Sequence, residues 1–426
     1  MTLRMKGFSL MTRSHNDFLW GASSSPHQIE GNNVNSDWWV YEQQMPNFSL
    51  SGDAVDSYHR YAEDMRLLAE AGLTSYRFGI EWARVEPLPG EFSIAVLQHY
   101  RRMIDTAHDL GLTPVVTLHH FSSPRWFIEE GGWFGETAID RWSAYVTQVC
   151  EILHDVQWVA TINEPNMYAF MMLMASGITG SVVPEFETPT IQPENGFVLP
   201  RPLPEAVEVL IKAHHAAREI VRQNTSAKVG WTVANLAMYA DAPENEARFL
   251  EERYAREDVF MEAARGDDFI GVQAYTTQAV GADGLIPHPP HEDNTLVGSP
   301  YRPDSLGIAI RHAWEVTGGV PILVTENGIA TADDSRRVAY IEEALKHLFA
   351  AADDGIDIRG YLHWSALDNF EWGHWEPTFG LIAVDRTTFE RTPKPSLARL
   401  GEIARTRTTT PSEGWREKTP APLLGT

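Results

Sequence analysis

Two glutamates have the side chains and the positions best suited to chemistry, because each ends a short apolar stretch typical of a buried strand. Glu164 lies in Thr161-Ile162-Asn163-Glu164-Pro165, and Glu326 lies in Thr325-Glu326-Asn327-Gly328. If both strands belong to one parallel barrel, their C-terminal ends meet at the same mouth. Two carboxyl groups at one mouth can cleave a glycosidic bond, one as proton donor and the other as nucleophile or as base for water. The distance between them, which decides retention or inversion, is not contained in the sequence.

Other polar and aromatic residues near predicted strand ends are suited to binding a sugar. Amide, imidazole and carboxyl groups can hydrogen-bond hydroxyls, and indole rings can cover the apolar face of a pyranose. Candidates of these two kinds are Gln28, His120, Asn163, Glu371, Trp364 and Trp372. Arg77, at the end of the second predicted strand, could pair with a mouth carboxylate and keep it ionised, as a nucleophile requires.

Eight apolar stretches are predicted to be the strands that position these residues: 18–22, 75–80, 113–118, 158–162, 228–233, 269–272, 321–325 and 360–364. Segments between them have helical spacing, for example at Tyr61, Met65 and Leu68. Eight strand–helix units predict an α/β fold, a single (β/α)8 TIM barrel with extended βα loops. An open doubly wound sheet is disfavoured because no glycine fingerprint follows the first strand.

The whole chain, 1–426, is predicted to be one domain, with an ordered barrel over about 16–405 and tails at 1–15 and 406–426. Two Pro-rich segments, roughly 176–204 and 276–304, follow the fourth and sixth predicted strands and are candidate walls of a substrate site. The Met-rich stretch 167–174 is either helix core or an apolar entrance for an aglycone.

Composition excludes several classes of protein. The chain has 34 basic and 58 acidic residues, a net charge of −24, which argues against a nucleic-acid partner. Its one cysteine, Cys150, excludes an intrachain disulfide and a cysteine-built metal site, and it is compatible with a cytoplasmic location. No apolar run approaches the length of a membrane span, and no secretory signal is visible at the N-terminus.

An ordered series of motifs resembles glycoside hydrolase family 1, the retaining β-glycosidases that include β-glucosidases and β-galactosidases. The series runs from about Asp17 to Ile403 and includes both glutamate motifs, Phe18-Leu19-Trp20-Gly21-Ala22, Gln28-Ile29-Glu30-Gly31, Tyr76-Arg77-Phe78, Asp368-Asn369-Phe370-Glu371-Trp372 and Arg391-Thr392-Pro393-Lys394. The resemblance implies a double-displacement reaction on a small β-glycoside, with neither metal nor cofactor.

The resemblance also implies a role for each site residue. Glu326 would be the nucleophile and Glu164 the acid and base, with Arg77 and Tyr275 contacting the nucleophile. Asn163 would bond the sugar 2-hydroxyl, a contact that strengthens in the transition state. The rest of the terminal sugar would be held by Gln28, His120, Phe121, Trp364, Glu371 and Trp372.

Several positions depart from the family pattern, and two of these segments contain residues expected to contact the sugar or the nucleophile. His119-His120-Phe121 stands where Tyr-His-Trp is frequent, so a phenyl ring replaces an indole against the sugar. Gln273-Ala274-Tyr275 stands where Asn-Tyr-Tyr or Asn-Phe-Tyr is usual, although the final tyrosine is kept. Glu371 disfavours 6-phosphoglycosides, because its carboxylate would repel a phosphate.

Several functional alternatives stay open at this level. We expect a β-glucosidase, with a β-galactosidase, a β-fucosidase or a disaccharide-releasing β-glycosidase as enzymatic alternatives and a catalytically silent sugar-binding protein as the non-enzyme alternative. A metal-dependent hydrolase is disfavoured because no His-Glu-x-x-His spacing occurs, and a serine esterase because Gly-x-Ser-x-Gly is absent. Oligomeric state and the balance between hydrolysis and transglycosylation are not readable from the sequence.

Overall fold

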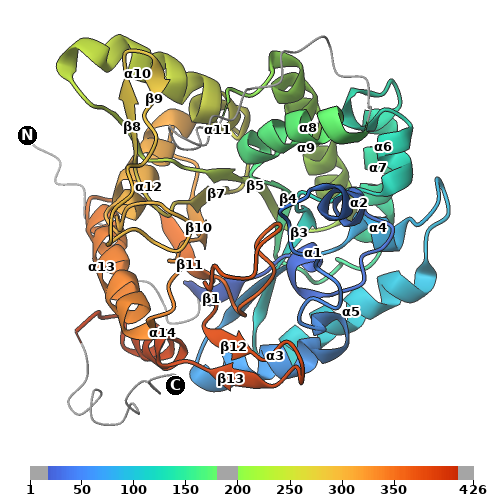
Figure 1. The fold of residues 1–426 in the computed structure, drawn as a ribbon. Coiled ribbons are helices and arrows are strands. Elements are labelled where there is room, and N and C mark those ends of the chain that lie inside the picture. The colour runs from blue at the N-terminus through green and yellow to red at the C-terminus, as the bar shows by residue number, and fades with distance from the viewer. Residues whose placement is uncertain (1–17, 180–199, 411–426) are drawn as a thin grey trace, which may run out of the picture.

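The structure, a computed structural model, describes residues 18–179 and 200–410, and its centre is a closed barrel of eight parallel strands (Figure 1). The order around the barrel is β1-β11-β10-β7-β5-β4-β3-β2. The strands are β1 Leu19–Ser23, β2 Ser75–Gly79, β3 Thr113–His119, β4 Trp158–Asn163, β5 Lys228–Ala234, β7 Ile270–Gln273, β10 Ile322–Glu326 and β11 Ile358–Trp364. Each predicted strand corresponds to one of these, so the predicted TIM barrel is confirmed.

Helices surround the barrel and connect successive strands (Figure 1). The helical spacing at Tyr61, Met65 and Leu68 lies in α3, which ends at Gly72 with φ of 98°, a left-handed conformation that glycine adopts without a Cβ penalty. The longer outer helices are α3 Ser57–Ala71, α5 Ile94–Asp109, α7 Ala138–Cys150, α9 Pro204–Asn224, α12 Ser305–Thr317, α13 Asp334–Asp353 and α14 Pro395–Thr406.

Shorter elements decorate the barrel ends. The short helices are α1 Pro26–Ile29, α2 Asp37–Gln44, α4 Trp82–Val85, α6 Arg125–Glu129, α10 Glu246–Arg253 and α11 Val259–Ala263, with a π-helix at Tyr254–Asp258. The longer α8 Pro165–Thr179 follows β4. The extra strands are β6 Met238–Ala240, β8 Gln278–Gly281, β9 Gly284–Leu285, β12 Ile382–Val384 and β13 Arg391–Pro393. Among the described residues, no helix has the length and apolar character needed to cross a membrane.

The two largest clusters of buried apolar side chains occupy separate regions. The larger core lies between the strands and the outer helices. A smaller cluster of barrel-strand residues and their immediate neighbours contains Leu19, Val115, Trp158, Ala160, Phe269, Leu323 and Leu362. Alternation along a strand sends successive side chains to opposite faces, so these residues mark the inward-facing set.

Irregular pairing occurs just before both motif glutamates. The register between β4 and β5 shifts between Ala160 and Asn163, and the register between β10 and β7 shifts between Val324 and Glu326. Strict alternation from the inward residues Ala160 and Leu323 would send Asn163 and Glu326 outward. The shifts reverse that alternation and direct both side chains into the mouth of the barrel, a common use of bulges beside active sites.

The predicted loop 276–304 contains β8 and β9, which pair with each other and, through β8, with β6. Residues of this loop line the pocket described below, and its role as a substrate-facing wall stays a prediction. Residues 180–199 and most of both predicted tails lie outside the described residues, so the expectations for the first Pro-rich segment, the tails and the domain boundaries stay predictions.

Candidate active site

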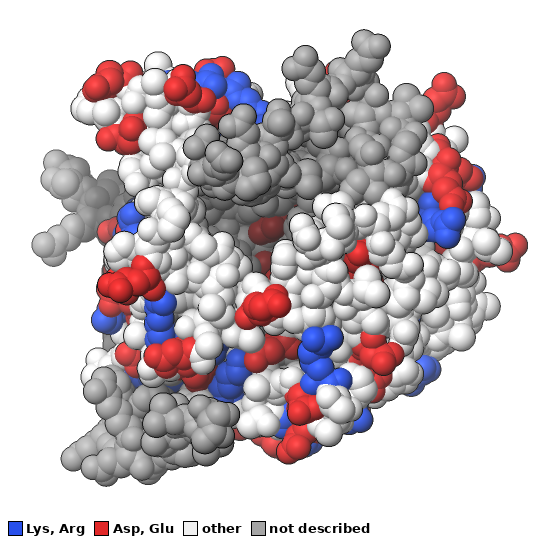
Figure 2. All heavy atoms as spheres, viewed as in Figure 1, with Lys and Arg blue, Asp and Glu red and all other residues white. Residues whose placement is uncertain are grey.

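A pocket of about 650 Å³ lies at the C-terminal ends of the barrel strands. Figure 2 shows acidic atoms deep in a hollow near the centre of this face of the molecule. Nine predicted site residues line the pocket: His120, Phe121, Asn163, Glu164, Tyr275, Glu326, Trp364, Glu371 and Trp372. The other two, Gln28 and Arg77, are fully buried behind this lining. The fold therefore gathers residues from positions 28 to 372 around one cavity.

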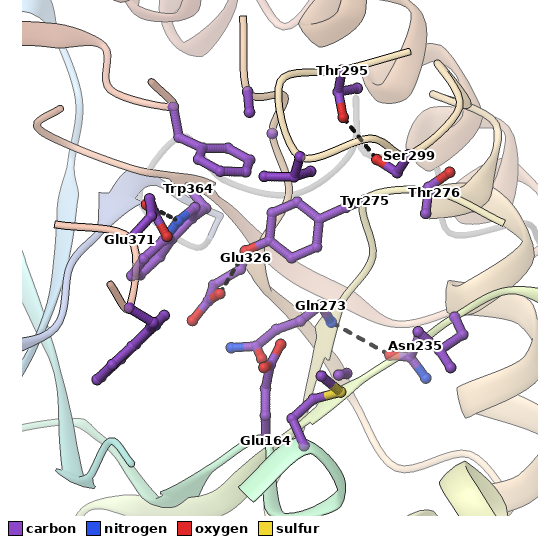
Figure 3. A pocket seen from close by; sticks show the side chains of 18 of the residues that line it. Glu164, Asn235, Gln273, Tyr275, Thr276, Thr295, Ser299, Glu326, Trp364 and Glu371 are labelled. Atoms are coloured by element: carbon purple, nitrogen blue, oxygen red, sulfur yellow. Dashed lines mark hydrogen bonds between the residues drawn. The ribbon is translucent and has the colours of Figure 1, made fainter. Parts of the chain in front are cut away.

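Glu326, the last residue of β10, is fixed by two donors. Arg77 Nη1 lies 2.5 Å from Glu326 Oε1. The Tyr275 hydroxyl donates to Glu326 Oε2 at 2.6 Å (Figure 3). Both Arg77 and Glu326 are almost entirely buried. Charge-assisted bonds of this length are among the stronger interactions in proteins, so the carboxylate has one well-defined position.

Glu164 is held through its backbone and leaves its carboxyl group free to face the pocket. Its φ is 41°, a left-handed value rarely adopted by a non-glycine residue, and its N–H donates to the Thr232 carbonyl at 2.7 Å. Pro165 then begins α8, since proline is well tolerated in the first helical turn. Within the described residues, no donor or cation contacts the Glu164 side chain as Arg77 contacts Glu326.

The two glutamates therefore differ in protonation. Burial and the nearby negative charge of Glu326 hold the pKa of Glu164 well above its ordinary value, against a smaller opposing effect of Arg77. Burial also raises the pKa of Glu326, but Arg77 and Tyr275 both stabilise its ionised form. When one proton is shared between them, it resides on Glu164.

Arg77 also fixes the orientation of the Asn163 amide. A guanidinium only donates, so the atom 2.6 Å from Arg77 Nη2 must be Asn163 Oδ1. Asn163 Nδ2 then faces His120 Nε2 at 3.1 Å, which makes that ring nitrogen the acceptor. Burial and the charge of Arg77 hold the pKa of His120 well below its ordinary value, so the ring is neutral and carries its proton on Nδ1. That buried N–H has no partner in the described part of the chain.

Gln28 and Glu371 form a second hydrogen-bonded polar group at the site. Gln28 Nε2 donates to Glu371 Oε2 at 3.1 Å, and Trp364 Nε1 lies 3.3 Å from Glu371 Oε1. Burial, with a contribution from the charge of Glu326, raises the pKa of Glu371 to about 8. Gln28 thus supports Glu371, while Glu371 itself lines the cavity.

Aromatic rings close one side of the pocket. Trp372 packs edge-on against Phe121 at 5.1 Å, and His120 stacks with both Trp364 and Trp372. Phe121 and Trp372 have positive φ values of 66° and 47°. Such conformations are costly for bulky residues and persist where the surrounding structure imposes them, which is common at binding sites.

Sequence reasoning assigned no individual site role to several other lining residues, although it named the loop 276–304 that contains three of them; they are Asn235, Leu236, Gln273, Leu285, His288, Val297 and Phe379. Most lie in βα loops, where no residue-type pattern marks the direction of a side chain. Met167 and Met171, one helical turn apart on α8, line the pocket, so the Met-rich stretch does contribute to the cavity. Over residues 18–179 and 200–410, no group of three or more His, Cys, Asp or Glu could hold a metal ion.

Comparison with known proteins gives consistent matches over the whole barrel. The sequence profile described as glycosyl hydrolase family 1 matches residues 11–267 and 267–409. Thermostable beta-glucosidase B of Thermobispora bispora is 28% identical over 450 residues, covering 91% of this chain and 90% of that protein.

Solved structures match equally well. A β-glucosidase in its apo form is 41% identical, with a TM-score of 0.81 covering 92% of this chain and 99% of the other. The β-glycosidase of Pyrococcus horikoshii is 32% identical, with a TM-score of 0.83 covering 98% and 100%. From the extent of the family match, the closed barrel and the two glutamates at its mouth, we conclude that this chain belongs to glycosyl hydrolase family 1 and is a glycoside hydrolase.

Proposed function

We propose that the protein is a retaining β-glucosidase in which Glu326 is the nucleophile and Glu164 the acid and base. The observation that carries this assignment is the difference between the two glutamates. Glu326 is bonded to Arg77 and Tyr275, whereas Glu164 has no such partner among the described residues. A nucleophile must be ionised and a general acid must be protonated. The surroundings of Glu326 favour its ionised form, and those of Glu164 favour its protonated form.

In the first step, Glu326 attacks the anomeric carbon while Glu164 gives its proton to the glycosidic oxygen. The C–O bond to the leaving group breaks, a glycosyl ester forms on Glu326, and the aglycone leaves as an alcohol. Esterification removes the negative charge of Glu326. Since that charge is one of the causes that raise the pKa of Glu164, the pKa falls once the ester has formed.

In the second step, ionised Glu164 takes a proton from a water molecule, whose oxygen attacks the anomeric carbon. The ester bond breaks, Glu326 is released as a carboxylate, and the sugar leaves with its original β configuration. Glu164 is again protonated, and both residues return to their starting states.

Support for a neutral terminal glucose comes from the lining and from relatives. None of the described lining residues is lysine or arginine, so a phosphate or carboxylate on the sugar would meet no cation among them, which disfavours phosphorylated or acidic sugars. Relatives from Thermobispora bispora and Phanerodontia chrysosporium carry the name β-glucosidase. We also propose a cytoplasmic location, with which the single cysteine, Cys150, is compatible.

The test is hydrolysis of aryl β-glucoside, galactoside, fucoside, xyloside and 6-phosphoglucoside by the parent, Glu164→Ala and Glu326→Ala. We expect glucoside turnover, loss of all turnover in Glu326→Ala, and survival in Glu164→Ala only for a leaving group that needs no proton. Proton NMR of the first-formed sugar should show the β-anomer. A protein that binds glucosides but cleaves none of the panel would be a sugar-binding protein, and an α-anomer would exclude double displacement.

A further inference from the structure

Gln273 is a pocket residue to which the proposed mechanism gives no part. It is the last residue of β7 and pairs with Ala234 of β5 on one side and Glu326 of β10 on the other. The residue is only 1% exposed, yet its side chain lines the pocket. Gln273 therefore lies between β10, which ends at Glu326, and β5, which neighbours β4, the strand that precedes Glu164.

The orientation of the Gln273 amide follows from donor and acceptor chemistry. Asn163 Oδ1 is fixed toward Arg77, as shown above, and it also accepts from Thr232 Oγ1 at 3.0 Å. The Gln273 atom 2.9 Å from Asn163 Oδ1 must therefore be Nε2, because an oxygen there would face another acceptor. This places Gln273 Oε1 on the remaining side of the amide. Oε1 is buried and has no hydrogen-bond partner within the described residues.

Glu164 offers the complementary group. A protonated carboxyl has one O–H to donate, and the described part of the chain gives the Glu164 side chain no acceptor. Glu164 and Gln273 both line the pocket, and Figure 3 shows both side chains among its lining. A buried acceptor without a donor and a donor without an acceptor thus face one cavity. Leaving such groups unpaired costs free energy, so pairing them is favoured.

We propose that Gln273 is a positioning residue for the acid: its Oε1 accepts the hydrogen bond of protonated Glu164, while its Nε2 holds Asn163. The proposal rests on the role of Glu164 given under Proposed function. The proton stays on Glu164 until it passes to the glycosidic oxygen, and no bond to Gln273 forms or breaks. One amide thereby orients the proton donor and the residue adjacent to it in the sequence.

A measurable consequence is the pH at which the acid loses its proton. An acceptor for the O–H stabilises the neutral form of Glu164, so removing it lowers the pKa of Glu164. Removing that acceptor leaves the other titratable and charged groups around the described pocket in place. They are Glu326 on β10, Arg77 on β2, Tyr275 after β7, His120 after β3, His288 after β9 and Glu371 before β12. A single neutral hydrogen bond corresponds to a displacement of about 0.4 to 1 pH unit.

The experiment compares Gln273→Met with Thr232→Val through the pH profile of kcat/KM on an aryl β-glucoside with a poor leaving group. Methionine keeps the length of the side chain and removes both amide functions. Valine removes a different donor from Asn163 Oδ1 and leaves the Gln273 amide intact. We expect Gln273→Met to move the basic limb about 0.4 to 1 unit toward lower pH. Thr232→Val should lower kcat/KM without moving that limb.

Further arms separate the possible outcomes. Gln273→Glu keeps an acceptor oxygen, so its basic limb should not move toward lower pH, and this variant decides the matter if Gln273→Met does not fold. Equal displacement in Gln273→Met and Thr232→Val would overturn the proposal, since the effect would then act through Asn163. A second outcome would also overturn the proposal. In it, Gln273→Met loses activity on the glucoside but keeps it on the 2-deoxy analogue, and the basic limb of the pH profile does not move. Oε1 would then bind the sugar 2-hydroxyl. A parent enzyme without Glu164-dependent hydrolysis would instead contradict the proposed function itself.

Discussion

Replacing Tyr275 by phenylalanine removes one of the two donors that keep Glu326 ionised. The hydroxyl donates to Glu326 Oε2 at 2.6 Å, and the ring packs edge-on against Phe379 with centroids 5.9 Å apart. Phenylalanine preserves this packing, so the substitution deletes the hydrogen bond and little else. Arg77 still contacts the other oxygen, so measurable activity should remain.

The magnitude follows from the type of bond. A hydrogen bond to a charged group contributes about 1.5 to 3 kcal/mol. One pH unit corresponds to about 1.36 kcal/mol, so the pKa of Glu326 should rise by about 1 to 2 units. The bond stabilises the carboxylate, and losing it favours protonation. The acidic limb of kcat/KM, below which the nucleophile is neutral, should therefore move about 1 to 2 units toward higher pH.

The assay is kcat/KM on an aryl β-glucoside across the pH range, for the parent, Tyr275→Phe and Tyr340→Phe. Tyr340 is a matched control because its buried hydroxyl donates to the Tyr275 carbonyl at 2.9 Å and does not contact either glutamate. We expect no displacement of the acidic limb in Tyr340→Phe. An acidic limb in Tyr275→Phe that coincides with that of the parent would refute the assignment of Tyr275 as a donor to the ionised nucleophile.

Three further predictions concern the aglycone and stability. Met171→Gln should lower kcat/KM for aryl glucosides by up to about tenfold relative to a disaccharide, because an apolar wall of the pocket is lost; equal losses on both would contradict this. Burial raises the pKa of Asp37 from 3.8 to about 8, so the folded protein holds a proton that the unfolded chain releases above about pH 4, and stability falls as pH rises toward 8. Asp37→Asn should therefore raise Tm at pH 8 relative to the parent and change it little at pH 5, and an identical pH dependence of Tm in both proteins would refute the reasoning. Arg391 and Asp64 form a fully buried pair at 2.8 Å, so Arg391→Met should cost about 3 to 5 kcal/mol in urea unfolding. Adding Asp64→Asn should recover much of this loss, and a double variant as unstable as the single one would exclude an unpaired charge as the cause.

Local patterns were sufficient to predict the barrel. Alternating short apolar stretches and helical spacing correspond to the eight strands and to helices such as α3, because burial of one face is imposed residue by residue. The motif glutamates, Glu164 and Glu326, were identified for the same reason, since a charge at the end of a buried strand stands out from its neighbours. These features need only neighbouring residues and the periodicity of each element.

The partners of the site residues depend instead on contacts between distant positions. Arg77 and Glu326 are 249 positions apart, and nothing near either residue in the sequence specifies their contact. Gln28 is fully buried and donates to Glu371, 343 positions away, a contact that no local pattern indicates; its expected contact with a sugar stays a prediction. In the sequence, Gln273 was noted only as a departure from a family pattern. That its Oε1 has no hydrogen-bond partner among the described residues follows only from the positions of Asn163 and Arg77 in the folded protein.

The sequence by itself determined the eight strands, the helical spacing between them and the two carboxyl groups, because the periodicity of each element is a local property. Tertiary structure alone decided which way the decisive side chains face. Regular alternation would turn Asn163 and Glu326 out of the barrel, and only the register shifts against β5 and β7 turn them inward. Such a shift depends on how two neighbouring strands pair, and strand pairing is a property of the assembled sheet that no single segment contains.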